Sequence, residues 1–186
     1  MNNLLLTSCG LETPAITEAF LRRLPTAPSA IRALFIPTAA RNPDAIEVLP
    51  KCLHDLLKIG IPRENITVHD LHDPIDGALS QRWDIVYLCG GNTRYLLRRI
   101  NEQGFREQLL AYIREGGVVV GVSAGSIIFS STHPGHLGLL PRPLDVHCPD
   151  EVCEQPGAIS VRTDKPIRLG NRQAIRWENG TPVVLE

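Results

Sequence analysis

Short apolar runs and amphipathic stretches alternate along the first two thirds of the chain. The apolar runs predict strands at residues 4–8, 31–36, 66–68, 83–89 and 118–122. Apolar residues at helical spacing predict helices at residues 13–24, 44–59, 93–100 and 105–113, with Pro50 kinking or restarting the second of these helices. Strands alternating with helices indicate parallel pairing through right-handed crossovers. We therefore expect an α/β fold of three layers, a doubly wound and mostly parallel sheet with helices on both faces.

The pattern changes after about residue 135. Prolines become frequent, helical periodicity is lost, and short β-rich pieces occur at residues 158–161, 173–177 and 183–184. No repeat or low-complexity linker separates this part from the rest. A length of 186 residues suits one domain better than two, so we expect a single domain over residues 1–186.

Composition excludes several classes of partner. Of the side chains, 19 are basic and 20 are acidic, and the formal net charge of −1 gives no preference for nucleic acid or a membrane surface. The amino terminus lacks a basic n-region, and no apolar run reaches the roughly 18 residues of a membrane span. These features favour a cytoplasmic protein without nucleic-acid or membrane partners.

Cysteine usage argues against a disulfide framework, because the five cysteines are odd in number and widely scattered. Cys148 and Cys153 are the one close pair. With His147 beside them they lack the second Cys/His cluster that a zinc site needs, so we expect no metal and no other cofactor. Cys9 and Cys89 lie at strand ends, where the role of a small buried hydrophobic residue is favoured for each.

The strand at 118–122 ends in a G-x-S-x-G pattern, Gly121-Val122-Ser123-Ala124-Gly125. This pattern is typical of a nucleophile elbow, in which glycines permit a sharp strand-to-helix turn and the serine hydroxyl stands above the sheet edge. The amide of Ala124 would then face a developing oxyanion. Small residues at such a turn also occur for packing alone, so the pattern needs support from other residues.

A second glycine loop, Gly90-Gly91-Asn92-Thr93, follows the strand at 83–89. Ligands of open parallel sheets gather beyond the carboxyl ends of the strands, where this loop and the elbow would converge. Its amides suit an oxyanion, although a tight turn with Thr93 as helix cap explains the residues about as well. A phosphate site is disfavoured, since neither G-x-G-x-x-G nor a P-loop lysine is present.

A serine nucleophile needs a base, and histidine is the usual one. We expect His54, His69 and His72 to be surface or locally bonded residues, and His133 and His136 to face away from Ser123. His147 lies beyond the proline-containing segment 141–143, where the chain can return to the sheet edge. It is the favoured base.

Three motifs together resemble the peptidase E family, the aspartyl dipeptidase and cyanophycinase group of serine peptidases. They are residues 89–97 (CGGNTRYLL), 121–126 (GVSAGS) and 137–141 (LGLLP). The resemblance implies a class I glutamine amidotransferase-like, flavodoxin-like fold with serine at the nucleophile position. It maps the nucleophile onto Ser123, the oxyanion-hole amides onto Gly91 and Ala124, and the catalytic histidine onto His147. Glutaminase chemistry is disfavoured because the elbow holds serine rather than cysteine.

The resemblance implies a hydrolase of short peptides. We expect Asn92 and Thr93 beside the substrate, and the protein to be a monomer or homodimer. The segment that carries the dipeptidases' triad aspartate is missing, because no Asp or Glu lies between Ser123 and Asp145. The candidates for the acid are Asp145, Asp150, Glu151 and Glu154. Family dipeptidases hold an acidic substrate side chain with an arginine, and Arg142, Arg162 and Arg168 occur in the altered region. The alternative is a catalytically impaired member that binds a small ligand or a partner protein.

Overall fold

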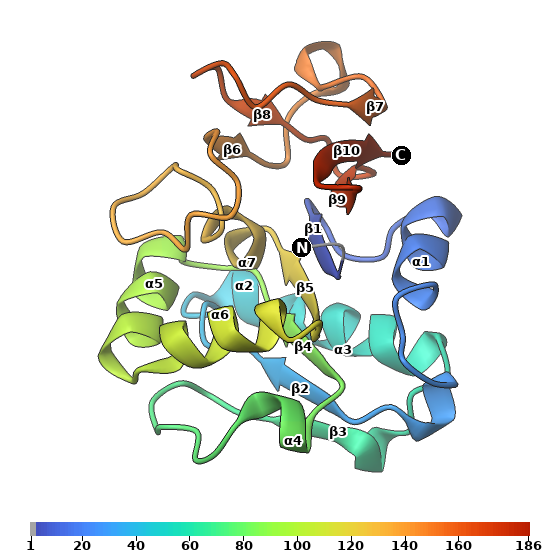
Figure 1. Cartoon of the computed structure of the whole chain (residues 1–186), viewed down its shortest axis with the longest axis vertical. Helices are drawn as coiled ribbons and strands as arrows, with labels where there is room; N and C mark the ends of the chain where they lie inside the picture. The colour runs from blue at the N-terminus through green and yellow to red at the C-terminus, as the bar shows by residue number, and fades with distance from the viewer. Residues whose placement is uncertain (1–2) are drawn as a thin grey trace.

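The computed structural model describes residues 3–186 and contains an eight-stranded sheet in the order β3-β2-β4-β5-β1-β9-β10-β7 (Figure 1). Five strands are parallel. They are β1 (Leu4–Thr7), β2 (Ala33–Ile36), β3 (Ile66–Val68), β4 (Ile85–Leu88) and β5 (Val118–Val122). Three strands extend the β1 edge in antiparallel fashion. They are β9 (Ala174–Glu178), β10 (Thr181–Leu185) and β7 (Gly157–Ala158).

Helices cover both faces of the parallel part (Figure 1). One face carries α1 (Pro14–Leu21) and α3 (Leu49–Lys58), and the other carries α5 (Thr93–Glu102) and α6 (Phe105–Arg114). The short elements are α2 (Pro43–Glu47), α4 (Leu79–Arg82), α7 (Ala124–Ile127), and the 3-10 helices Pro28–Ala30, Arg63–Asn65 and Asp150–Val152. The predicted three-layer, doubly wound and mostly parallel fold is confirmed.

Successive side chains of each strand point to opposite faces of the sheet, so the core is divided into two clusters, one on each face. In β4, Val86 and Leu88 pack with the α5 and α6 side, whereas Ile85 and Tyr87 pack with the α1 and α3 side. Because successive strand side chains point to opposite faces, a strand buried on both sides reads as a continuous apolar run. This is why the strands were predictable from the sequence.

Pro50 restarts the helix predicted over 44–59 rather than merely kinking it. The helical stretch breaks at Val48, which separates α2 from α3, and Pro50 occupies the first turn of α3. A proline is tolerated there because the first amides of a helix have no intrahelical acceptor. The break makes α2 and α3 two pieces of one wall beside the carboxyl ends of the strands.

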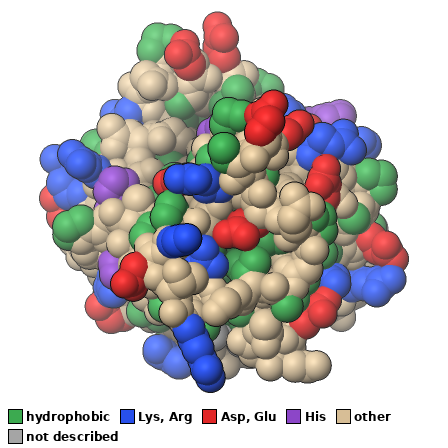
Figure 2. Space-filling model, turned by 90° about the horizontal axis from the view of Figure 1, so that it is seen from above, with side chains coloured by type: hydrophobic (Ala, Val, Ile, Leu, Met, Phe, Trp, Pro, Cys, Tyr) green, Lys and Arg blue, Asp and Glu red, His purple; other side chains and the backbone are tan. Residues whose placement is uncertain are grey.

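The C-terminal segment, residues 137–186, departs from the parallel pattern. Besides the three antiparallel strands it forms a separate parallel pair, β6 (Leu144–Asp145) with β8 (Ile167–Arg168), which the sequence did not predict. Figure 2 looks onto the end of the molecule that carries this segment and shows acidic and basic side chains interspersed. No helix within residues 3–186 has both the length and the apolar character needed to cross a bilayer.

Candidate active site

Ser123 lies at the sharp turn between β5 and α7. Its backbone has φ 50° and ψ −110°, and its amide donates to the carbonyl of Thr7 at 3.0 Å. Residues other than glycine rarely adopt positive φ, and such strain is concentrated at functional sites. The turn therefore has the conformation expected of a nucleophile elbow.

The two glycines of the elbow are required by close backbone packing. A Cβ on Gly121 would lie 2.4 Å from the carbonyl oxygen of Gly125, and a Cβ on Gly125 would lie 2.2 Å from the carbonyl oxygen of Leu88. Both distances are far below van der Waals contact. The G-x-S-x-G spacing thus reflects the packing of the turn against β4 as well as the presentation of Ser123.

The glycine loop after β4 lies directly against the elbow, because β4 and β5 are neighbours in the sheet. A Cβ on Gly90 would lie 3.2 Å from the Cβ of Ser123. Gly91 has φ 136°, and a Cβ on it would lie 2.1 Å from the carbonyl oxygen of Ala39. Within residues 3–186 the amides of Gly91 and Ala124 donate to no protein acceptor.

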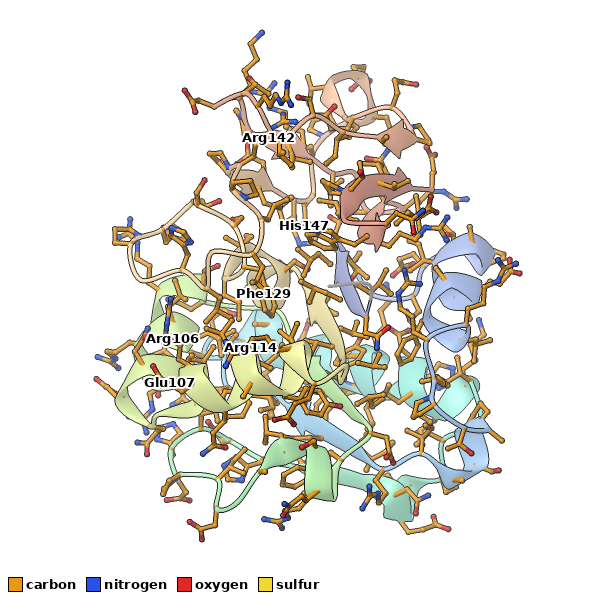
Figure 3. All side chains as sticks on the ribbon, viewed as in Figure 1. Arg106, Glu107, Arg114, Phe129, Arg142 and His147 are labelled. Carbon is orange, nitrogen blue, oxygen red and sulfur yellow. The ribbon has the colours of Figure 1, made fainter. Side chains whose placement is uncertain are left out.

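His147 comes from the C-terminal segment and reaches the elbow. Its Nε2 lies 3.0 Å from Ser123 Oγ, and its Nδ1 lies 2.7 Å from Asn171 Oδ1. An amide oxygen can only accept a hydrogen bond, so Nδ1 carries the proton and donates it to this contact, and Nε2 is left unprotonated as an acceptor for the serine hydroxyl. Figure 3 shows His147 between the β6–β8 pair and the main sheet.

The loop that carries His147 is tied to the end of β1. The His147 backbone amide donates to Ser8 Oγ at 2.9 Å, and His147 has φ 57°. β1 also supports the elbow, since Ser126 Oγ donates to the Thr7 carbonyl at 2.8 Å. One strand end therefore positions both the nucleophile turn and the histidine loop.

The partner of His147 Nδ1 is an amide, which corrects the expectation of a carboxylate there. Asp145 lies 3.7 Å from Arg168, Asp150 begins the 3-10 helix at 150–152, and Glu151 is exposed on that helix. Neither they nor Glu154 is a hydrogen-bond partner of His147 in the part of the chain that the structure describes. Asn171 was missed because it belongs to no motif and follows Gly170 in a turn far along the chain.

Asn92 and Thr93, predicted beside the substrate, lie at the start of α5. The Asn92 side chain accepts a hydrogen bond from the Tyr95 amide at 2.9 Å, so Asn92 rather than Thr93 is the helix cap. Neither residue lines the cavity at Ser123. The glycines of the loop therefore approach the elbow, and the polar residues after them form the helix start.

A cavity of about 440 Å³ opens beside Ser123 and His147. Its floor is formed by the residues that follow β1, β4 and β5, and one wall is formed by the α2–α3 segment. Cys9 and Cys52 face it, and the fully buried Cys89 lies behind Cys52. Burial raises the pKa of the Cys9 thiol, whereas a hydrogen bond with the Cys89 thiol lowers the pKa of Cys52.

The arginines considered for substrate recognition lie away from this cavity. The Arg142 guanidinium is almost fully buried and donates to the carbonyls of Ser160, Lys165 and Pro166 and to Glu154. Arg168 lies beside Asp145, and neither these two nor Arg162 lines the cavity. Figure 3 shows Arg142 within the C-terminal segment, beyond His147 as seen from the main sheet.

Ser123 lies on a strained elbow, with a histidine at hydrogen-bond distance and amides nearby that have no protein acceptor. This arrangement is typical of α/β proteins with a serine–histidine site. The chain belongs to Peptidase family S51, whose profile matches residues 4–136. This confirms the resemblance to the peptidase E family. An uncharacterised peptidase of Listeria innocua is 28% identical over 130 residues, and the peptidase E of Salmonella heidelberg is 32% identical over 95 residues.

The alignments with these relatives span only part of each protein. The alignments cover 70% and 50% of this chain but 60% of the Listeria protein and 39% of the Salmonella protein. A solved structure of a candidate peptidase E from Listeria monocytogenes EGD-e has a TM-score of 0.71 at 19% identity, covering 100% of this chain and 98% of that one. A peptidase from an acI-B1 Actinobacterium has a TM-score of 0.64 at 19% identity, covering 98% and 86%. These two structures support the fold alone.

Proposed function

We propose that this protein is a serine peptidase that hydrolyses short peptides. The observation that carries the proposal is the chain of contacts from Ser123 Oγ to His147 Nε2 at 3.0 Å and from His147 Nδ1 to Asn171 Oδ1 at 2.7 Å. Nucleophile, base and orienting group within hydrogen-bond reach are the signature of an activated serine. Family membership supports the same reaction class.

In the proposed mechanism Ser123 Oγ attacks the peptide carbonyl carbon while its proton passes to His147 Nε2. The amides of Gly91 and Ala124 donate to the oxyanion of the tetrahedral intermediate. His147 then gives the proton to the leaving amine, and the acyl-enzyme forms on Ser123. Water, deprotonated by His147, hydrolyses the ester and restores the serine.

Asn171 is proposed to position His147. Its amide oxygen holds the proton on Nδ1, which is the tautomer that a general base at Nε2 requires. A neutral amide stabilises the imidazolium less than a carboxylate does, so a modest turnover is expected. Even where an asparagine in a serine protease holds the wrong tautomer and lowers turnover by about 10⁴-fold, oxyanion hole and binding retain about 10³ to 10⁴ over water.

The same amide motivates the second candidate function, a ligand-binding member of the family with little or no turnover. A dipeptide library hydrolysis assay separates the two. We expect wild-type protein to release amino acids and the Ser123→Ala and His147→Ala variants to release none. Hydrolysis that persists in Ser123→Ala would contradict the proposed mechanism, and the absence of hydrolysis by wild type would favour the binding function.

A further inference from the structure

The wall of the Ser123 cavity that faces the catalytic pair comes from the α2–α3 segment. Ala45, Val48 and Lys51 of this segment line the cavity together with Val122 below Ser123. Val48 has 47% of its surface exposed, although it is a large aliphatic residue. An exposed aliphatic side chain at the mouth of a concave site marks a surface that an apolar ligand group can cover.

The charges on this wall disfavour an acidic substrate group. The Lys51 ammonium is paired with the Glu12 carboxylate, and this hydrogen bond raises the pKa of Lys51. The exposed Asp44 also lines the cavity, and no ion pair of Asp44 occurs within residues 3–186. Glu12 thus offsets the charge of Lys51, and Asp44 adds a negative charge at the cavity, so a substrate carboxylate there would meet like charge.

Among the described residues, no arginine lines the cavity to pair with a substrate carboxylate. Arg142 is held by three carbonyls and Glu154, and Arg168 lies beside Asp145. The lining of the cavity contains no guanidinium group among the described residues. The recognition of an acidic side chain by arginine, which is a feature of the family dipeptidases, thus has no counterpart at Ser123.

We infer that the cavity takes an uncharged aliphatic side chain flanking the scissile bond, and that Val48 is a residue determining this specificity. The inference rests on the proposed function, because it assumes that the peptide carbonyl reacts at Ser123. The substrate class is a short peptide with a residue such as Leu, Val or Met at that position. Aspartyl and glutamyl peptides are poor substrates.

The test compares kcat/KM for paired dipeptides that carry leucine or aspartate at one position, with each position varied in turn. For wild type we expect the leucine peptide to be favoured by about 10- to 100-fold at one position, the range for filling a hydrophobic pocket. Val48→Asp should reduce this ratio by about 10-fold or more. Val161→Asp is the matched control, since Val161 is 41% exposed and does not line the cavity, and its ratio should stay at the wild-type value.

A second variant tests the charge argument. Glu12→Gln removes the partner of Lys51 and should raise kcat/KM for the aspartate peptide relative to the leucine peptide by about 10-fold. Preference of wild type for aspartate or glutamate peptides would overturn the inference. A leucine-to-aspartate ratio unchanged by Val48→Asp would also overturn it.

Binding to the Ser123→Ala variant, measured by calorimetry with the same peptides, tests specificity without turnover. We expect tighter binding of the leucine peptide, and equal or tighter binding of the aspartate peptide would overturn the inference. Hydrolysis that does not depend on Ser123 would instead contradict the proposed function. The two failures are therefore distinguishable.

Discussion

The residues of the site come from two regions of different construction. Residues 3–136 form the parallel sheet with its helices and supply Ser123 and both glycine loops, and the family profile covers almost this same range. The C-terminal segment supplies His147 and Asn171 from loops beside short strands. Ser123, the proposed nucleophile, is thus held by regular structure, whereas His147, the proposed base, is held by a few specific hydrogen bonds.

This difference explains which parts of the site can change. A substituent on Gly121, Gly125 or Gly91 would collide with backbone carbonyls, so the elbow and the glycine loop tolerate little change. The orienting group of the histidine needs only an acceptor at Nδ1, and asparagine meets that need where the resemblance implied an acid. The predictions below test this division.

The largest effect is expected for the histidine that joins the two regions. His147→Gln should lower kcat by at least about 10⁴-fold, because Ser123 then has no base. His54→Gln on the exposed side of α3 is the control and should keep full activity. Retention of more than a tenth of wild-type turnover in His147→Gln would remove His147 from the mechanism.

The second effect concerns Asn171. Asn171→Ala should lower kcat by about 10²-fold with little change in KM, because the imidazole loses its orientation but the cavity keeps its shape. Asn171→Asp should raise kcat above wild type and move the acidic limb of the pH–rate profile to higher pH, because a carboxylate favours the protonated ring. Equal activity and pH profiles in all three proteins would contradict a positioning role.

A smaller effect is expected at the contact between the regions. Ser8→Ala removes the acceptor of the His147 amide and should cost about 1 kcal/mol of positioning, or about fivefold in kcat. Ser8→Thr retains a hydroxyl and serves as the comparison. A kcat in Ser8→Ala indistinguishable from wild type would show that the histidine loop holds its place without β1.

The smallest effect on activity is expected at the opposite, amino end of β4. Asp84 receives three hydrogen bonds from Arg32. Burial alone would raise the pKa of the Asp84 carboxyl. The bonds and the positive charge of Arg32 outweigh this effect of burial, so the pKa lies below its usual 3.8. Asp84→Asn should lower the free energy of unfolding by about 1 kcal/mol at neutral pH, since the guanidinium is half exposed, without changing kcat.

The pH dependence of that stability follows from the lowered pKa. The contribution of Asp84 is present above its unfolded pKa and is lost as the pH falls through the folded value. Denaturant unfolding of wild type and Asp84→Asn should therefore differ at pH 7 and converge in the acid range. A difference that stays constant down to the lowest pH would contradict the charged interaction.

The fold and the sharp turn at Ser123 were predictable because each rests on local sequence patterns. Buried parallel strands give apolar runs, and the turn after β5 needs glycines at fixed spacing. His147 could be proposed from its place after the proline-containing segment and from the family resemblance.

Asn171, Val48 and the Lys51–Glu12 pair could not be predicted. Asn171 and the Lys51–Glu12 pair meet their partners across segments distant in the chain, and an exposed asparagine or valine has no pattern that distinguishes a site residue. The β6–β8 pair was missed for a related reason, since two-residue strands carry no periodicity. The oligomeric state and the single-domain organisation stay predictions.

The most direct test of the central claim is labelling with a fluorophosphonate probe, which reacts with an activated serine hydroxyl. We predict that wild-type protein is labelled at Ser123, that His147→Gln is labelled far more slowly, and that Ser123→Ala is not labelled. Equal labelling of wild type and Ser123→Ala would contradict the claim that Ser123 is the nucleophile of this site.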